Sequence, residues 1–178
     1  MFDGKYKLER YVDPWADDLF KWAKLYNIEL MGSIWSEEGL ETASAFCKRY
    51  KIAHQMRDQY VIDKALNDWR ETFMSFTQAD GRGLLSNVKP IFCTDRYPTP
   101  IKEVRMPKRF HELGWHGYSD HTIGNDNCLK AIAFGAKYIE VHMTLNKDRL
   151  EMRDHVFSSM PDELAELVRV GRGLARVA

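Results

Sequence analysis

The sequence has few of the features that mark several large classes of protein. Its 178 residues contain three cysteines, Cys47, Cys93 and Cys128, which are far apart and form no CxxC pair. This spacing excludes a disulfide framework and a zinc knuckle. Free cysteines of this kind are most often small buried hydrophobes. Thiols without disulfide partners suit a reducing compartment, so we expect a cytoplasmic protein.

Long apolar runs and an excess of one charge are also missing. No run approaches the roughly 18 residues of a membrane span, and residues 1–5 are charged and lack the apolar core of a signal peptide. The 26 Lys and Arg residues are balanced by 26 Asp and Glu. A balanced chain has no general attraction to nucleic acid or to an anionic membrane, so we expect neither partner. No Walker loop, GxGxxG, HExxH or GxSxG element occurs.

The sequence does contain an alternation of strand-like and helix-like stretches. Apolar residues with helical spacing follow Pro14, and this predicts a helix with Asp13 as its N-cap. Strands are predicted at residues 28–35, 51–56, 71–78, 88–94, 115–119 and 138–144. Helices are predicted at residues 36–50, 61–69, 106–113 and 125–134, with a last helix that begins near residues 159–163.

Strands that alternate with helices favour βαβ units around a parallel sheet. Several predicted strands end in polar residues, such as Asp95, His121 and His142. In a TIM-type (β/α) barrel, the carboxyl ends of the strands build the active site. A complete barrel has eight strands and takes about 250 residues. The sequence therefore predicts an α/β fold of this type that is incomplete, with about six strands.

Two histidines are the best candidates for metal ligands. His121 and His142 each follow a predicted strand, and the two strands are consecutive, so they would be neighbours in a parallel sheet. Two imidazoles at adjacent strand ends can share one divalent ion and leave positions for water and substrate. On spacing alone, a histidine at a strand end is more often a structural residue held by hydrogen bonds.

Side chains two residues apart on a strand share a face, so Glu140 should lie beside His142 and Ser119 beside His121. A carboxylate at this place could position substrate or act as a general base, and a hydroxyl could bind a phosphate or carboxylate. The alternatives are an ion-paired Glu140 and a Ser119 that caps local backbone. Asp120 should point to the other face, where a structural role is expected.

Two loops could cover these strand ends. Asp154 lies in a polar stretch before the last helix, where it belongs either to the site or to a surface charge cluster. Tyr97 lies in a proline-rich turn after a predicted strand and could contact a sugar or simply pack in the turn.

Five motifs in this order resemble the N-acetylneuraminate (sialic acid) synthase family. That family reads CxxxYP, then G-[YL]-SDHT, GAxxIExH-[FM]-TL, DHxxS and PxEL. The corresponding stretches here are residues 93–98, 117–122, 135–145, 154–158 and 161–164. A weaker similarity covers residues 13–60.

The resemblance implies condensation of phosphoenolpyruvate with an N-acylated amino sugar of the N-acetylmannosamine type, which gives a 2-keto sugar acid and phosphate. It implies a divalent metal, Mn²⁺ or Mg²⁺, that polarises the sugar aldehyde. Carried over by position, the catalytic residues are Glu140, Tyr97 and Asp154, the substrate-binding residues are Ser119, Asp95 and Tyr97, and the metal ligands are His121 and His142.

The chain also departs from the family pattern. We expect residues 1–178 to form a single barrel domain that lacks the family's first two strands and its C-terminal antifreeze-like domain. A lysine that should meet an anionic substrate is Glu71 here. An open six-strand barrel would expose sheet edges, so we expect a homodimer or a complementing barrel fragment. A non-catalytic sugar-binding or metal-binding subunit is the alternative function. A different metal-dependent barrel enzyme would need a glycine-rich phosphate loop, which residues 146–156 lack.

Overall fold

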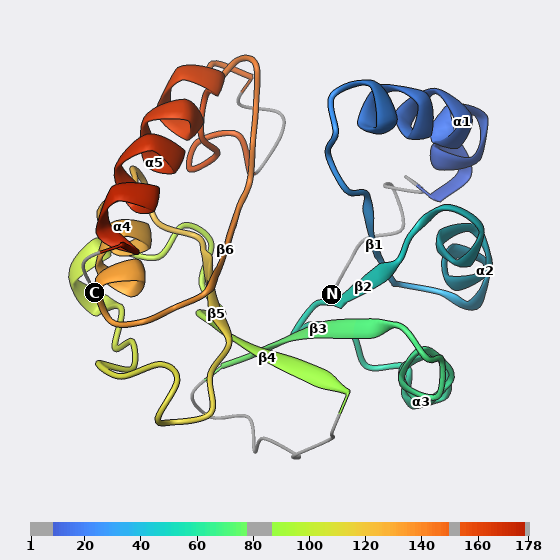
Figure 1. The fold of residues 1–178 in the computed structure, drawn as a ribbon, viewed down its shortest axis with the longest axis horizontal. Coiled ribbons are helices and arrows are strands. Elements are labelled where there is room, and N and C mark those ends of the chain that lie inside the picture. The colour runs from blue at the N-terminus through green and yellow to red at the C-terminus, as the bar shows by residue number, and fades with distance from the viewer. Residues whose placement is uncertain (1–8, 78–86, 150–153, 177–178) are drawn as a thin grey trace. The chain divides into compact units, whose positions relative to one another are not determined.

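The computed structural model describes residues 9–77, 87–149 and 154–176, with side chains from residue 17 onward (Figure 1). The elements in chain order are α1 (Glu9–Leu25), β1 (Met31–Ser33), α2 (Glu37–Phe46), β2 (Arg49–Ile52), α3 (Gln59–Leu66), β3 (Glu71–Phe76), β4 (Val88–Cys93), the 3₁₀ helix η1 (Ile101–Glu103), β5 (Gly117–Asp120), α4 (Asp126–Ala133), β6 (Tyr138–Val141) and α5 (Pro161–Leu174).

The prediction of an incomplete (β/α) barrel with six strands is confirmed. The strands follow one another in the sheet in chain order, from β1 to β6. The pairs β1–β2, β4–β5 and β5–β6 are parallel. Parallel neighbours bring their carboxyl ends to the same edge of a sheet, as the barrel prediction requires. Within the described residues, no helix is both long enough and apolar enough to cross a bilayer.

The helix starts follow from local capping. Ser36 Oγ accepts a hydrogen bond from Gly39 N at 3.0 Å and so caps α2, as its sequence predicts. Asp58 caps α3 in the same way by accepting from Val61 N at 3.2 Å. Pro161 opens α5, where the missing N–H costs nothing, and Glu163 accepts from Met160 N at 2.8 Å.

Two predicted helix boundaries are wrong at the N-terminal end of the chain. Helix α1 begins at Glu9, so Asp13 is not its N-cap and Pro14 lies inside the helix, where it has no N–H to donate. Helix α2 ends at Phe46, and Tyr50, which was expected in that helix, is buried in β2.

The predicted helix at residues 106–113 is also wrong, because that stretch forms turns. The N–H of Phe110, which a helix would direct to Met106, instead donates to the carbonyl of Phe134 at 2.9 Å. Phe110 and Met106 are buried in the hydrophobic core, together with Phe92, Val104, Trp115, Tyr118, Ala131 and Ala136. Long-range packing therefore overrides the local helical pattern.

The chain divides into two compact units. Residues 1–73 and 85–88 make up the N-terminal unit, and residues 74–84 and 89–178 make up the C-terminal unit. In the C-terminal unit, α4 and α5 lie side by side (Figure 1). All of the candidate site residues named above belong to this unit.

The N-terminal unit combines an apolar core with ion pairs and buried polar groups. Arg70 pairs with Asp68, which also accepts a hydrogen bond from the Tyr50 hydroxyl at 3.0 Å. The Arg70 guanidinium lies 5.3 Å from the centre of the Tyr50 ring. Burial and the Asp68 carboxylate raise the pKa of Tyr50 to about 12, so the hydroxyl stays a proton donor. Lys51 and His54 are also buried in this unit.

Candidate functional site

The register between β5 and β6 separates core residues from site residues. Tyr118 lies opposite Ile139, and both pack into the hydrophobic core on the helical side of the sheet. One residue later, Ser119 lies opposite Glu140, and the Ser119 hydroxyl donates to Glu140 Oε1 at 2.9 Å. Because successive side chains on a strand point to opposite faces, Ser119 and Glu140 face away from the helices.

The expectation that Asp120 points to the other face is confirmed. Its carboxylate accepts hydrogen bonds from the Tyr118 hydroxyl at 2.9 Å, from the Cys128 thiol at 3.0 Å and from the Thr122 N–H at 2.9 Å. Burial, followed by the Asp120 carboxylate, raises the pKa of both Tyr118 and Cys128. Asp120 therefore stabilises the end of β5 from the helical side.

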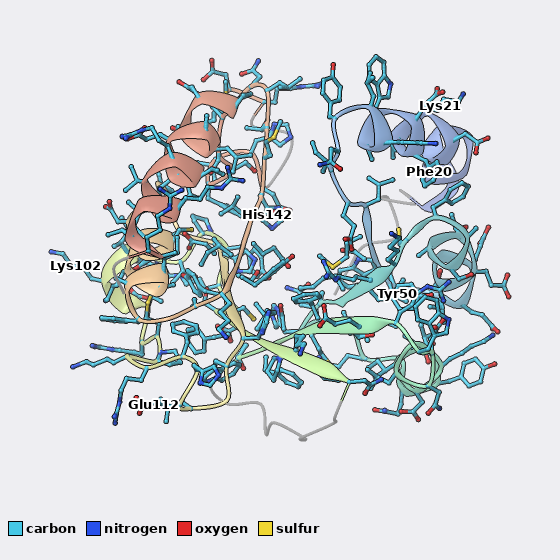
Figure 2. The ribbon with its side chains drawn as sticks, in the orientation of Figure 1. Phe20, Lys21, Tyr50, Lys102, Glu112 and His142 are labelled. Atoms are coloured by element: carbon cyan, nitrogen blue, oxygen red, sulfur yellow. The ribbon has the colours of Figure 1, made fainter. Side chains whose placement is uncertain are left out.

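The two histidines continue this register and lie together. Asp120 of β5 pairs with Val141 of β6. The residue after Asp120 is His121, and the residue after Val141 is His142. The centres of the two imidazole rings are 5.5 Å apart. His121 is 3% exposed, while the His142 side chain is 35% exposed, so a ligand would approach from the His142 side. Figure 2 shows His142 beside the chain that continues from β6.

Tyr97 lies against the histidine pair. Its ring centre is 4.0 Å from that of His121. The backbone carbonyl of His121 accepts a hydrogen bond from Thr99 N at 2.8 Å, and this bond fixes the turn that carries Tyr97 to the end of β5. The turn thus brings Tyr97 beside His121, and a contact of Tyr97 with a sugar stays a prediction.

Three carboxylates contribute to a raised pKa of the Tyr97 hydroxyl. Burial is the main cause that raises the pKa of Tyr97, and the carboxylates of Asp154, Glu140 and Asp95 raise it further. The phenol therefore stays protonated at neutral pH and can donate a hydrogen bond. Asp95 is exposed, which places it at the rim of the site rather than inside it.

Asp154 reaches the site from the segment that precedes α5. Its Oδ2 atom is 3.7 Å from Nδ1 of His142, within ion-pair distance and beyond a direct hydrogen bond. The segment of residues 154–159 is anchored to the end of β6, because Ser159 N donates to the carbonyl of His142 at 2.8 Å and Thr144 N donates to the carbonyl of Ser159 at 3.0 Å.

Phe157 lies in the same segment, and sequence reasoning missed it. The residue is buried, and its ring contacts those of Tyr97, His121 and His142. The available signal was an apolar pair, Val156 and Phe157, at the two variable positions of the loop motif DHxxS.

The residues at this site fit a divalent ion by the chemistry of their donor groups. His121 and His142 offer two imidazole nitrogens, and Asp154 offers a carboxylate beside one of them. A carboxylate next to the second nitrogen of a ligand histidine is a common arrangement in metal sites. In the part of the chain that the structure describes, no three His, Cys, Asp or Glu side chains are already gathered as a ligand set.

Glu71 belongs to the N-terminal unit. It begins β3, at the opposite end of the strand from the carboxyl end, and its carboxylate pairs with Arg49 at 2.9 Å. Arg49 also pairs with Glu29 at 3.2 Å. This carboxylate therefore belongs to an ion-pair network at the start of β2 and β3, and its replacement of a substrate-binding lysine stays a prediction.

The comparisons with known proteins agree with this architecture. The model of the NeuB family matches residues 5–177, which is nearly the whole chain. The chain belongs to the NeuB family. The resemblance to sialic acid synthases that the five motifs indicate is thereby confirmed.

Named relatives of this NeuB-family chain are sugar-acid synthases. An N,N'-diacetyllegionaminic acid synthase of Campylobacter jejuni is 41% identical over 86 residues, which are 46% of this chain and 25% of that protein. A pseudaminic acid synthase of the same species is 29% identical over 174 residues, which are 86% of this chain and 50% of that protein. The chain thus spans at most half the length of these curated relatives.

A solved structure supports the fold. The N-acetylneuraminic acid (sialic acid) synthetase of Leptospira borgpetersenii superimposes with a TM-score of 0.78 at 20% identity, over 99% of this chain and 69% of that one. At this identity, the likeness shows a shared barrel architecture.

Proposed function

We propose that this chain carries the metal-binding and sugar-binding part of a NeuB-type synthase site. The reaction condenses phosphoenolpyruvate with an N-acylated amino sugar of the N-acetylmannosamine type. Carbon 3 of phosphoenolpyruvate forms a bond to the sugar aldehyde carbon, water adds at carbon 2, and phosphate leaves. The products are a 2-keto sugar acid and inorganic phosphate. The observation that carries this proposal is the pair His121 and His142 on adjacent strand ends beside Glu140.

In this proposal, His121 and His142 hold a divalent ion, Mn²⁺ or Mg²⁺. A bound ion of this kind supplies Lewis-acid polarisation of a carbonyl oxygen, which is worth several kcal/mol in a transition state. Asp154 orients the His142 ring from the side of Nδ1. The greater exposure of His142 leaves room for the sugar on its side of the pair.

The remaining residues bind and transfer protons. Glu140, held in place by the Ser119 hydroxyl, takes the proton of the water that adds to carbon 2. The Tyr97 hydroxyl stays protonated and donates a hydrogen bond to the sugar. Asp154 accepts hydrogen bonds from sugar hydroxyls. Ser119 and, at the rim, Asp95 contact phosphoenolpyruvate.

One observation favours a second candidate, a non-catalytic subunit that binds a sugar or a metal. The side chains that raise the pKa of Tyr97 include three carboxylates, Asp154, Glu140 and Asp95. This acidic surrounding attracts a cation and suits a neutral sugar better than the anionic phosphoenolpyruvate. A synthase needs cations for its phosphate group, which a separate copy or barrel fragment would then supply.

The two functions are separated by following phosphate release. The protein is incubated with Mn²⁺, phosphoenolpyruvate and N-acetylmannosamine, alone and with a separately expressed fragment that carries the first two strands of a NeuB-family barrel. Release that is lost in His121→Ala supports the synthase. Sugar binding in Mn²⁺ without any phosphate release, with or without the fragment, contradicts catalysis and supports the binding subunit.

A further inference from the structure

Phe157 is the residue on which the aromatic side chains of the site converge. Its ring centre is 5.1 Å from that of His142 and 5.9 Å from that of His121, and the interplanar angles of 76° and 88° make both contacts edge-to-face. Its ring is also 5.9 Å from that of Tyr97. Edge-to-face pairs are favourable arrangements of aromatic rings, so one side chain contacts both candidate ligands in a preferred geometry.

The backbone around Phe157 is fixed to the strand that carries one of these ligands. Ser159 N donates to the carbonyl of His142, and Thr144 N donates to the carbonyl of Ser159, which forms a parallel bridge between Met143 and Ser159. A ring two residues before this bridge has little freedom to shift along β6. Phe157 is also only 6% exposed, so water does not reach the imidazoles through its position.

We propose that Phe157 is a positioning residue that sets the spacing and mutual angle of His121 and His142. This inference rests on the proposed function of the two histidines as ligands of one ion. A shared ion requires both imidazole nitrogens to converge, and ligand side chains keep such geometry only when neighbouring groups restrict their rotamers. His142 is partly exposed, so contact with Phe157 on its buried side supplies much of that restriction.

The test compares two buried phenylalanines of the same unit. Phe157→Leu removes the ring but keeps most of the apolar volume, and Phe110→Leu makes the same change in the hydrophobic core, where Phe110 is fully buried. Both variants lose packing, so both should unfold at lower temperature. Only Phe157→Leu should alter the two histidines, which separates positioning from general stability.

The first measurement needs no metal. In NMR spectra of the metal-free protein, nuclear Overhauser contacts between the ring protons of His121 and His142 should weaken in Phe157→Leu and persist in Phe110→Leu. Unchanged contacts between the two imidazoles in Phe157→Leu would overturn the proposal.

The second measurement is a titration of the metal-free protein with Mn²⁺, in which electron paramagnetic resonance detects the free and bound ion. We expect Phe157→Leu to weaken Mn²⁺ binding about tenfold. Loss of a group that orients a metal ligand lowers metal affinity by roughly 10–100-fold. We expect Phe110→Leu to stay within about twofold of the unmodified protein, since it lies outside the ligand set. Equal affinity of Phe157→Leu and the unmodified protein would overturn the positioning role. Absence of Mn²⁺ binding by the unmodified protein would instead overturn the proposed function, and the NMR contacts would still decide the role of Phe157.

Discussion

The two units of the chain arrange their charged and polar groups in different ways. In the N-terminal unit, opposite charges meet: Arg49 pairs with Glu29 and Glu71, and Arg70 pairs with Asp68. Opposite charges also pair in the C-terminal unit, as Lys147 does with Glu163, but at the ends of β5 and β6 groups of similar chemistry meet. Two imidazoles lie side by side, and three carboxylates act on one phenol. Paired charges stabilise a fold, whereas acidic groups and imidazoles gathered at strand ends favour a cation from outside the protein.

The largest expected effect is a loss of Mn²⁺ affinity, and it tests whether the C-terminal unit alone forms the metal site. The chain offers a buried histidine in each unit, His121 at 3% and His54 at 8% exposure. We expect His121→Ala to lower Mn²⁺ affinity by more than about 100-fold, since loss of a ligand exceeds the roughly 10–100-fold cost of losing outer-shell support. His54→Ala should leave the Mn²⁺ affinity nearly unchanged. Calorimetric titration of each variant with Mn²⁺ measures both affinities. An equal loss in His54→Ala would show that the N-terminal unit contributes to the site.

The second effect compares two glutamates that lie at opposite ends of their strands. Glu140 lies near the carboxyl end of β6, and Glu71 lies at the start of β3 in an ion pair. We expect Glu140→Gln to lower kcat for phosphate release by about 10²–10⁴-fold, the range of a lost general base. Glu71→Gln should change kcat little and lower only stability. Similar kcat values for both variants would remove Glu140 from the proposed chemistry.

The third effect compares a glycine in each unit. A Cβ atom on Gly117 would lie 2.2 Å from the carbonyl oxygen of Tyr138, which is backbone of the paired strand. A Cβ on Gly32 would lie 2.6 Å from the Ala43 methyl group of α2. We expect Gly117→Ala to lower the free energy of unfolding by about 3 kcal/mol and Gly32→Ala by about 1–2 kcal/mol, because a helix shifts more easily than a strand ladder. Denaturant titration measures both, and a larger loss in Gly32→Ala would contradict this order.

The smallest effect concerns stability at acid pH. The Lys147 ammonium and then the Met160 N–H lower the pKa of Glu163 below its usual value of 4.5. A lowered pKa in the folded state gives stability that is present at neutral pH and is lost as the pH falls through that pKa. We expect Glu163→Gln to lower the Tm by about 2–4 °C at pH 7, and this difference should vanish in strong acid.

The matched residue is Glu37, whose pKa is lowered mainly by Lys64, and the two side chains are 47% and 41% exposed. Glu37→Gln should change the Tm less than Glu163→Gln does, because Glu163 also accepts the Met160 N–H at the start of α5 and its partner Lys147 is less exposed than Lys64. A Tm difference for Glu163→Gln that persists below the pKa would mean that packing, and not charge, stabilises the start of α5.

Strand periodicity predicted how side chains alternate at the ends of β5 and β6. It was enough to separate Asp120, which bonds to Tyr118 and Cys128, from Ser119 and Glu140 on the opposite face, whereas the roles of Ser119, Glu140 and the two histidines stay predictions. The six strands and their order around a barrel also followed from alternation with helices. These features depend on neighbours one or two residues away, which the sequence displays directly.

The sequence did not predict what depends on contacts between distant segments. The turns at residues 106–113 exist because Phe110 N donates to Phe134, 24 positions away. The role of Phe157 depends on a backbone bridge from Ser159 to the end of β6. The position of Glu71 at the start of β3 depends on where that strand begins, and strand boundaries are poorly marked by composition.

The bridge between Ser159 and the end of β6 also decides which side chains of the site move together. It anchors the segment of residues 154–159 directly to the backbone of His142 and Thr144. Asp154 and Phe157 are therefore carried by the same strand end as His142. A displacement of the end of β6 would shift these side chains as one group rather than one by one.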